Sequence, residues 1–189
     1  MFTLGLSTWE ASTKERQQLI FVTVGSQRFQ FNRLLRVVDA CLCSEPSLGP
    51  TFAQSGWCDY APKSFECKPF LDRAEFAGRL AECDTVITHG GTGVIVSALK
   101  QSKRVLAMPR LARYGEHVDD HQVQLLTQFS AADLIEVFED AEALRKELSQ
   151  AAPCMRRAFR SGTQSFVEDL DSWLSLASRD KRTEPFQNG

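Results

Sequence analysis

The chain has 189 residues, of which 43% are hydrophobic and 24% are charged, and its formal net charge is −2. That length suits one ordinary domain, or one half of a two-domain enzyme, with enough apolar residues for a sizeable core. The near-neutral charge argues against a protein that binds nucleic acid through a basic surface. No apolar run approaches the ~20 residues of a membrane-spanning helix.

The ends of the chain and its cysteines indicate a domain that works in a reducing compartment. Residues 1–18 begin with a short apolar stretch, but charges follow too soon for a signal peptide, so we expect a flexible lead-in. We expect a nucleotide-sugar-binding α/β domain over 19–178 and a disordered tail over 179–189. Cys41 and Cys43 form a C-x-C pair, and the other four cysteines stand alone without zinc-ligand spacing. A cytoplasmic location is therefore expected.

Strand and helix patterns alternate in chain order. The expected strands are short apolar or β-branched runs that end at turn residues: 19–26, 51–54, 66–70, 85–88, 104–108 and 133–138. The expected helices keep a helical period of apolar residues or open at a capping residue: 31–42, 72–84, the segments that follow 93 and 120, 141–151 and 163–177. This alternation predicts an α/β fold, a single Rossmann-like domain with a parallel sheet and helices on both faces.

A glycine-rich turn, His-Gly-Gly-Thr-Gly (89–93), joins the strand at 85–88 to the next helix. Glycines let the backbone adopt positive φ angles and approach a ligand closely. The free N–H groups of the helix start attract an anion, and Thr92 is suited both to cap the helix and to donate to a phosphate. A tight turn that simply requires glycine is the alternative, and we favour phosphate binding.

Two common nucleotide-binding motifs do not match this turn. No Gly-Lys-Ser/Thr follows the glycines, as a P-loop would require, and the dinucleotide fingerprint G-x-G-x-x-G is missing. Gly25 and Ser26, at the end of the first strand, form a second candidate phosphate-binding turn. Its signal is weaker because it contains a single glycine. The loops after the strands at 85–88 and 104–108 each lead into a helix, which is how α/β proteins build a nucleotide site.

The segment Gly-Glu-His-Val-Asp-Asp-His-Gln (115–122) places imidazoles, carboxylates and an amide around a helix start. One of its two aspartates is expected to cap the helix. His121 and Gln122 then lie in the first turn, where their side chains can reach the glycine turn. His117 and His121 are four residues apart, as in some metal sites, but no third ligand of suitable spacing stands out. We favour a role in reading a sugar or phosphate, with a plain exposed loop as the alternative.

The chain resembles the family-28 glycosyltransferase C-terminal domain, the donor half of a GT-B enzyme. The resemblance covers roughly 19–140, and HGGTG and GEHxxDHQ are its specific motifs. It is closest to small stand-alone members, namely bacterial exopolysaccharide glycosyltransferase subunits and the catalytic subunit of the eukaryotic dolichol-linked UDP-GlcNAc transferase. The motifs that carry it occur in the family's order: IFVTVGS, the Gln-Ser-Gly turn at 54–56, ECDTVITHGGTG, the strand that ends in MPR, and GEHVDDHQ.

This resemblance implies a UDP-sugar site without a metal or other cofactor. The glycine turn would face the diphosphate, the loop after the next strand would flank the nucleotide, and the Asp-His-Gln helix start would face the donor sugar. The candidate catalytic residues are His121, Glu116 and His117. Carried over position by position, the UDP-sugar-binding residues are Gly25, Ser26, His89, Gly90, Gly91, Thr92, Gly93, Pro109, Arg110 and Gln122.

The resemblance also implies a reaction and a partner. A sugar would pass from UDP to an acceptor hydroxyl with inversion, while N–H groups at Thr92 and Gly93, with help from Arg110, stabilise the leaving UDP. Attack also needs a base near the acceptor hydroxyl. Glu116, His117 and Asp119 are the local candidates for that base, and the partner is the other source.

Small family members associate with a membrane-anchored partner that resembles the missing N-terminal half and brings a lipid-linked acceptor. We therefore expect a cytoplasmic subunit held at a membrane by that partner. The face of the tail helix that carries Trp173 is a candidate docking surface for a partner or a second copy, and core packing explains this apolar stripe equally well.

Two positions depart from the peptidoglycan lipid-intermediate relatives. Those relatives carry an acid on the helix after the glycine turn, which holds the ribose, and an Asn three residues after the sugar-reading Gln. Here Ser97 and Leu125 occupy these places. The departures leave the donor sugar open, and Ser97 favours the alternative of a non-catalytic UDP-binding or regulatory half-domain. A sugar-nucleotide epimerase would need a second domain, which the single expected domain does not provide.

Overall fold

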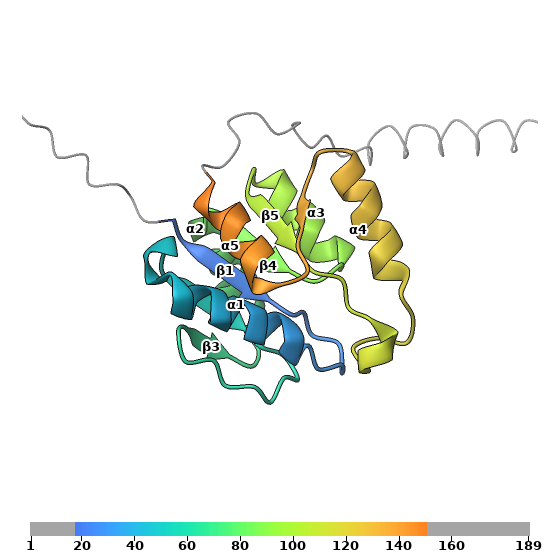
Figure 1. Ribbon diagram of the computed structural model, residues 1–189, viewed down its shortest axis with the longest axis horizontal. Coiled ribbons are helices and arrows are strands. Elements are labelled where there is room, and N and C mark those ends of the chain that lie inside the picture. Colours follow the sequence, from blue (N-terminus) through green and yellow to red (C-terminus); the bar gives the residue numbers. More distant parts are fainter. Residues whose placement is uncertain (1–17, 151–189) are drawn as a thin grey trace, which may run out of the picture.

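The computed structural model describes residues 18–150 of the chain. Within them, six strands form one sheet in the order β3-β2-β1-β4-β5-β6, and every neighbouring pair is parallel (Figure 1). The strands are β1 Ile20–Thr23, β2 Thr51–Gln54, β3 Glu66–Lys68, β4 Thr85–Thr88, β5 Arg104–Ala107 and β6 Glu136–Val137. The predicted parallel α/β fold is confirmed.

Helices cover both faces of this sheet. They are α1 Asn32–Ser44, α2 Arg73–Glu82, α3 Thr92–Lys100, α4 His121–Ala131 and α5 Ala141–Ser149, with short 3-10 turns η1 Pro46–Leu48 and η2 Ala112–Tyr114. Apolar residues of α1 and α5 share one core cluster with the sheet, and those of α2, α3 and α4 share the other. Figure 1 shows α1 and α5 together on one face of the sheet.

The first strand shows why its sequence is apolar at every position but the last. All four residues of β1 are buried, because the strand lies in the interior of a sheet that is covered on both sides. Ile20 and Val22 belong to the core cluster under α1 and α5, whereas Phe21 belongs to the cluster under the other helices. This alternation follows from successive side chains pointing to opposite faces of a strand.

The helix starts differ in how they are capped. Asp72, followed by Glu75 three residues later, predicts a capping box at α2. The structure confirms it, because Glu75 N–H donates to Asp72 Oδ1 at 2.8 Å and Asp72 N–H donates to Glu75 Oε2 at 3.2 Å. Most strands are shorter than predicted, and 133–138 contributes only Glu136–Val137 to the sheet.

Several predictions concern residues outside the described part of the chain. These are most of the lead-in at 1–18, the stop at Pro153, the tail helix at 163–177 with Trp173, and the tail at 179–189. The limits of the domain therefore stay predictions. None of the described helices combines the length and the apolar character that crossing a bilayer requires.

Candidate functional site

The sheet order places the predicted site at its topological switch point. β1 leads to α1 on one face, and the neighbouring β4 leads to α3 on the other. Crevices that bind ligands in open α/β sheets form where such loops diverge, beyond the carboxyl ends of the strands. Thr23 pairs with Thr88 at the end of the β1–β4 ladder, so Gly25 and His89 follow at the same edge.

Two glycines enclose the His89 ring. A Cβ at Gly25 would lie 2.7 Å from His89 Nε2, and a Cβ at Gly91 would lie 2.3 Å from His89 Cε1. No real Cβ atom tolerates such distances, so each position requires glycine for lack of space. Gly25 also has a φ of +79°, which glycine adopts without strain. The predicted residues of the first and fourth strands therefore do meet in one site.

In the 89–93 turn, close packing rather than an unusual backbone angle explains the glycines at 90 and 91. The prediction of positive φ in this turn is wrong, because among its glycines none has positive φ. Gly90 is confined by Gln122, whose Cβ would lie 2.6 Å from a Cβ on Gly90. A Cβ on Gly93 would have no heavy atom within 4 Å. One side of the turn is therefore packed, and Gly93 faces open space.

The start of α3 carries no side-chain cap. Gly91 is the N-cap residue and makes no side-chain hydrogen bond, whereas Thr92 is the first helical residue. The prediction that Thr92 caps the helix is therefore wrong. Thr92 and Gly93 are both exposed. An uncapped helix start presents N–H donors and the positive end of the helix dipole, which together suit an anion.

His89 is held in its neutral form. The residue is 8% exposed, and burial, together with the charge of Arg110, lowers the pKa of His89 from 6.5 to about 4. A neutral imidazole supplies no positive charge to a diphosphate. The anion-attracting part of the turn is therefore the backbone of α3 rather than this side chain.

This burial predicts a pH dependence of stability. The unfolded chain protonates His89 near pH 6.5 and the folded chain only near pH 4, so the unfolded state binds more protons between these values. The free energy of unfolding should therefore fall as the pH drops from 6.5 to 4, by up to about 3 kcal/mol from this residue. An NMR pH titration should show the His89 ring still neutral at pH 5. Titration of that ring near pH 6.5 would contradict its buried placement.

Gln122 connects three loops at this edge. Its Oε1 accepts the Gly90 N–H at 2.9 Å and the Arg110 N–H at 3.3 Å. The residue is 2% exposed. The prediction that it reaches the glycine turn from the first turn of α4 is confirmed. Because its carbonyl oxygen already holds two backbone groups, its first role in this structure is to position the turn.

Arg110 fastens the loop after β5 to the end of β1. The residue is 1% exposed, and its guanidinium donates to four backbone carbonyl oxygens. One nitrogen donates to Phe29 O at 3.2 Å, Gln30 O at 3.1 Å and Glu116 O at 2.9 Å. The other donates to Val24 O at 2.6 Å. Because the guanidinium is bonded to these carbonyls, it holds together the loops that surround the site. Its predicted contact with UDP stays a prediction.

Glu116 is buried and ion-paired. It is 1% exposed and accepts from Arg33 Nε at 3.0 Å, from the Arg33 guanidinium nitrogen at 2.8 Å and from Leu111 N–H at 3.0 Å. Arg33 also donates to Pro109 O at 2.7 Å. Glu116 is therefore the least accessible of the three predicted catalytic residues. Arg33 escaped the sequence analysis because nothing local links α1 to a loop more than 80 residues later.

The remaining part of the 115–122 loop gathers His117, Asp119 and His121. Both imidazole Nδ1 atoms approach Asp119 Oδ1, from His117 at 3.3 Å and from His121 in a shorter contact. Asp120 is the N-cap residue of α4, but its side chain does not cap the helix and accepts from Ala112 N–H at 2.7 Å instead. The expected aspartate cap is found in part: Asp120 bonds to the loop instead, whereas Asp119 Oδ1 accepts the N–H of His121, the first residue of α4, at 3.2 Å.

The two positions that depart from the peptidoglycan relatives have local partners. The Ser97 hydroxyl donates to Gly93 O at 2.7 Å, one turn back in α3. Leu125 packs against the core cluster beneath α4. Of the other predicted residues, Ser26 is exposed at the tip of its turn and Pro109 is half-buried. Ser97 thus lies in the helix that starts at the glycine turn, and its hydroxyl group donates its hydrogen bond to the backbone of that helix.

Exposed aromatic side chains adjoin the Gly25 turn and were missed by the sequence analysis. A Cβ at Gly56 would lie 2.8 Å from Gly25 O, which brings the turn after β2 against the turn after β1. The next residue, Trp57, is 51% exposed and meets the 43% exposed Phe70 edge to face. Arg28 lies 5.7 Å from the Trp57 ring. A single exposed tryptophan has no periodic signal that would distinguish it from a core residue.

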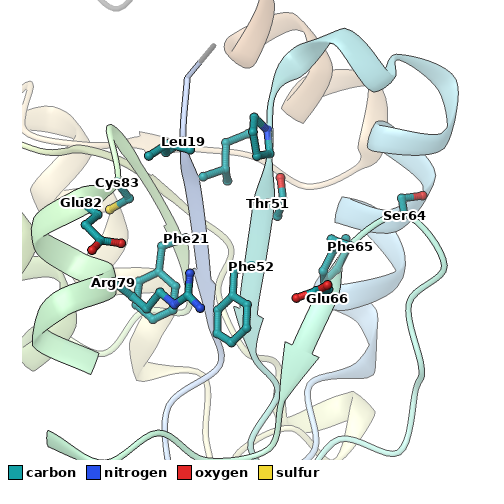
Figure 2. Close-up of a pocket in the computed structure, with 12 residues that line it drawn as sticks. Leu19, Phe21, Thr51, Phe52, Ser64, Phe65, Glu66, Arg79, Glu82 and Cys83 are labelled. Atoms are coloured by element: carbon teal, nitrogen blue, oxygen red, sulfur yellow. The ribbon is translucent and has the colours of Figure 1, made fainter. Parts of the chain in front are cut away.

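A pocket of about 410 Å³ lies at the opposite end of the sheet, and Figure 2 shows the residues that line it. It is bounded by the first residues of β1, β2 and β3 and by the last turn of α2. Arg79 lies over the Phe52 ring there, 4.0 Å from its centroid. Ligands of open parallel sheets bind beyond the carboxyl ends, so we place the functional site at the switch point and not in this cavity. Its lining residues are Leu19, Ile20, Phe21, Pro50, Thr51, Phe52, Ser64, Phe65, Glu66, Arg79, Glu82 and Cys83.

Fold and site together define a Rossmann-like α/β domain with an uncapped helix start at its switch point. The family model of the glycosyltransferase family 28 C-terminal domain matches residues 19–172. The chain belongs to this family, and it has the fold of the C-terminal, donor-binding half of GT-B glycosyltransferases. Comparison with curated protein sequences gave no match.

Solved glycosyltransferases share this fold at low sequence identity. The glycotransferase of kitacinnamycin aligns with a TM-score of 0.54 and 16% identity, over 77% of this chain and 38% of that one. SnogD from Streptomyces nogalater gives 0.50 and 19%, over 79% and 39%. MurG of Acinetobacter baumannii gives 0.52 and 16%, over 71% and 41%. The chain therefore spans well under half the length of these proteins.

Proposed function

We propose that this chain is the donor-binding, catalytic subunit of a two-component inverting glycosyltransferase that transfers a sugar from UDP to a lipid-linked saccharide. The observation that carries the proposal is the uncapped start of α3 behind a packed glycine turn, in a chain that belongs to glycosyltransferase family 28. The resemblance to small stand-alone family members supports a membrane-anchored partner as the source of the acceptor side.

The backbone of α3 would supply the chemistry at the diphosphate. Negative charge grows on UDP as the bond to the sugar breaks. Thr92 and Gly93 are exposed at the start of α3, and the helix dipole would add to the effect of their N–H groups. One such donor is typically worth about 3–4 kcal/mol of transition-state stabilisation. No metal or other cofactor is required for this step.

His121 would act on the sugar side of the site. It is 50% exposed in its side chain and bonded through Nδ1 to the Asp119 carboxylate. A carboxylate that orients an imidazole is the arrangement used where histidine accepts a proton. The pair is more accessible than Glu116, so His121 is the residue of this chain best placed to serve the attacking hydroxyl. The partner is the other source of that base.

The proposal is tested by calorimetric titration of the purified chain with UDP, with ADP and GDP as controls. Selective UDP binding at micromolar to sub-millimolar strength is expected. If the chain alone binds none of them, the titration is repeated on the chain co-expressed with its partner. Failure of the pair to bind UDP would refute the donor-subunit assignment.

The competing function is a UDP-binding or regulatory half-domain without catalysis. The observation in its favour is Ser97, whose hydroxyl bonds to its own helix where related enzymes carry an acid. Transfer from a UDP-sugar by the purified complex separates the two functions, because the regulatory module would bind UDP and transfer nothing. In the catalytic case His121→Ala should lower turnover at least about tenfold without loss of fold.

A further inference from the structure

Three side chains of the loop between β5 and α4 bring metal-ligating atoms together. One ring nitrogen of His117, one ring nitrogen of His121 and a carboxylate oxygen of Asp119 all lie within 4.8 Å of one another. The two imidazole rings meet edge to face with their centroids 4.8 Å apart. Two imidazoles and one carboxylate are the protein ligands of many zinc sites that keep a further position open.

Contacts of its neighbours hold His117 in place before any ion binds. Glu116, the preceding residue, is fixed by Arg33 and by Leu111 N–H. The His117 side chain is 10% exposed, and its ring packs against Phe29 with centroids 5.4 Å apart. A ligand whose orientation is fixed by packing costs little ordering on binding.

The other end of the cluster is fixed as well. Asp120, which precedes His121, accepts from Ala112 N–H. Gln122, which follows it, holds Gly90 N–H. His121 is therefore carried on backbone that is tied on both sides, while its half-exposed ring contacts the Asp119 carboxylate.

His121 and Asp119 already share a contact that an ion would replace. Asp119 N–H donates to His117 Nδ1 at 3.4 Å, and His121 Nδ1 contacts Asp119 Oδ1. An ion that binds His121 Nδ1 would release the proton of that contact, because metal ligands bind in their deprotonated forms.

We infer that His117, Asp119 and His121 form a binding site for a divalent transition-metal ion of the zinc type. Bonds of about 2.0–2.2 Å in a tetrahedral site place ligand atoms about 3.3–3.5 Å apart. The distance of 3.3 Å between His117 Nδ1 and Asp119 Oδ1 meets this requirement. The exposed His121 ring needs only to swing away from Asp119 for the ion to enter. Imidazole ligands favour zinc, cobalt, nickel and copper over magnesium or calcium.

This site departs from the expectation of no metal at the 115–122 motif. The two histidines alone did not predict a metal site because a third ligand was missing, and an aspartate was assigned to capping the helix. In the structure Asp119 Oδ1 accepts the His121 N–H at 3.2 Å and also lies beside both imidazoles, so it is the third ligand that the spacing did not reveal. Bound metal and proton uptake would compete for the same His121 ring, so the ion would act against a reaction in which His121 is the base.

The test uses the full chain and its three histidines. A titration with Zn²⁺, followed by NMR of the imidazole nitrogens, should perturb the rings of His117 and His121 and leave His89 unchanged as an internal reference. One equivalent should bind, with a dissociation constant in the micromolar range or below. Perturbation of no histidine at one equivalent would overturn the assignment.

Matched variants distinguish this site from the cysteines. His117→Gln, His121→Gln and Asp119→Asn should each weaken Zn²⁺ binding at least tenfold. Asp120→Asn, at the neighbouring carboxylate, should bind like the unsubstituted chain and serves as the control. Cobalt-loaded chain should lack the charge-transfer absorption of thiolate ligands. Unchanged affinity in Asp119→Asn, or a thiolate band, would assign the ion elsewhere. Thermal unfolding of each metal-free variant shows whether its fold is retained.

Discussion

Alanine at Gly91 should abolish UDP binding and destabilise the domain, whereas alanine at Gly93, two residues later, should weaken UDP binding without any loss of stability. A Cβ at Gly91 would lie 2.3 Å from the His89 ring, and that ring is blocked on its other side by Gly25. Overpacking of this kind costs about 1–3 kcal/mol. The turn would shift, and we expect UDP affinity to fall by more than tenfold.

Gly93 lies in the same motif but in open space. No heavy atom lies within 4 Å of its Cβ position, and alanine is a better helix former than glycine by up to about 1 kcal/mol. The variant should therefore be at least as stable as the original chain. Its methyl group would occupy the space in which we place the diphosphate, so UDP binding should decrease.

Gly78→Ala is the matched control for this pair. Gly78 lies in α2, and its Cβ position is equally free of neighbours. The substitution should raise stability by a similar amount and leave UDP affinity unchanged. Urea unfolding and UDP calorimetry on the three variants give the full comparison. If Gly93→Ala bound UDP as tightly as the original chain, the diphosphate would not lie at this turn.

Much of the fold followed from local patterns. Residues 19–24 are apolar or β-branched, as expected for a strand covered on both faces, and glycine turns mark the ends of β1 and β4. The strand predicted at 133–138 was wrong in extent. Asp133 adopts a left-handed conformation with φ of +57°, which aspartate tolerates. The chain thus needs several residues to leave α4, and Ile135 is apolar because it is buried in the core.

The site was predicted less completely. Local sequence patterns show neither the direction in which a side chain points nor its partners far along the chain. The residues at the ends of β1 and β4 were placed correctly, since parallel strands bring their carboxyl ends together. The pairing of Glu116 with Arg33 depends on α1 crossing over the later loop. Neither residue type nor spacing indicates that Arg110 turns inward towards four carbonyl groups. The positive charge of this arginine, in a loop beside the glycine-rich turn, suggested phosphate binding. In the structure Arg110 instead holds backbone carbonyls together.

That role predicts a large loss of stability in Arg110→Met. The substitution keeps much of the side-chain volume but leaves Val24 O, Phe29 O, Gln30 O and Glu116 O without their donor. Leaving a buried polar group unpaired costs about 1–3 kcal/mol, and water can reach some of these carbonyls once the guanidinium is gone. We therefore expect the free energy of unfolding to fall by at least about 2 kcal/mol, measured by urea unfolding without nucleotide.

Two companion variants separate the structural role from a nucleotide contact. Arg113→Met removes an exposed arginine that lies over the Tyr114 ring, and its stability should change by less than about 0.5 kcal/mol. Arg110→Lys keeps the charge but cannot span four acceptors, so an intermediate loss is expected. A contact with UDP alone would give the opposite pattern, with Arg110→Met as stable as the original chain and impaired only in UDP binding. Because the guanidinium ties the loop after β5 to the end of β1, we expect stability and UDP affinity to fall together.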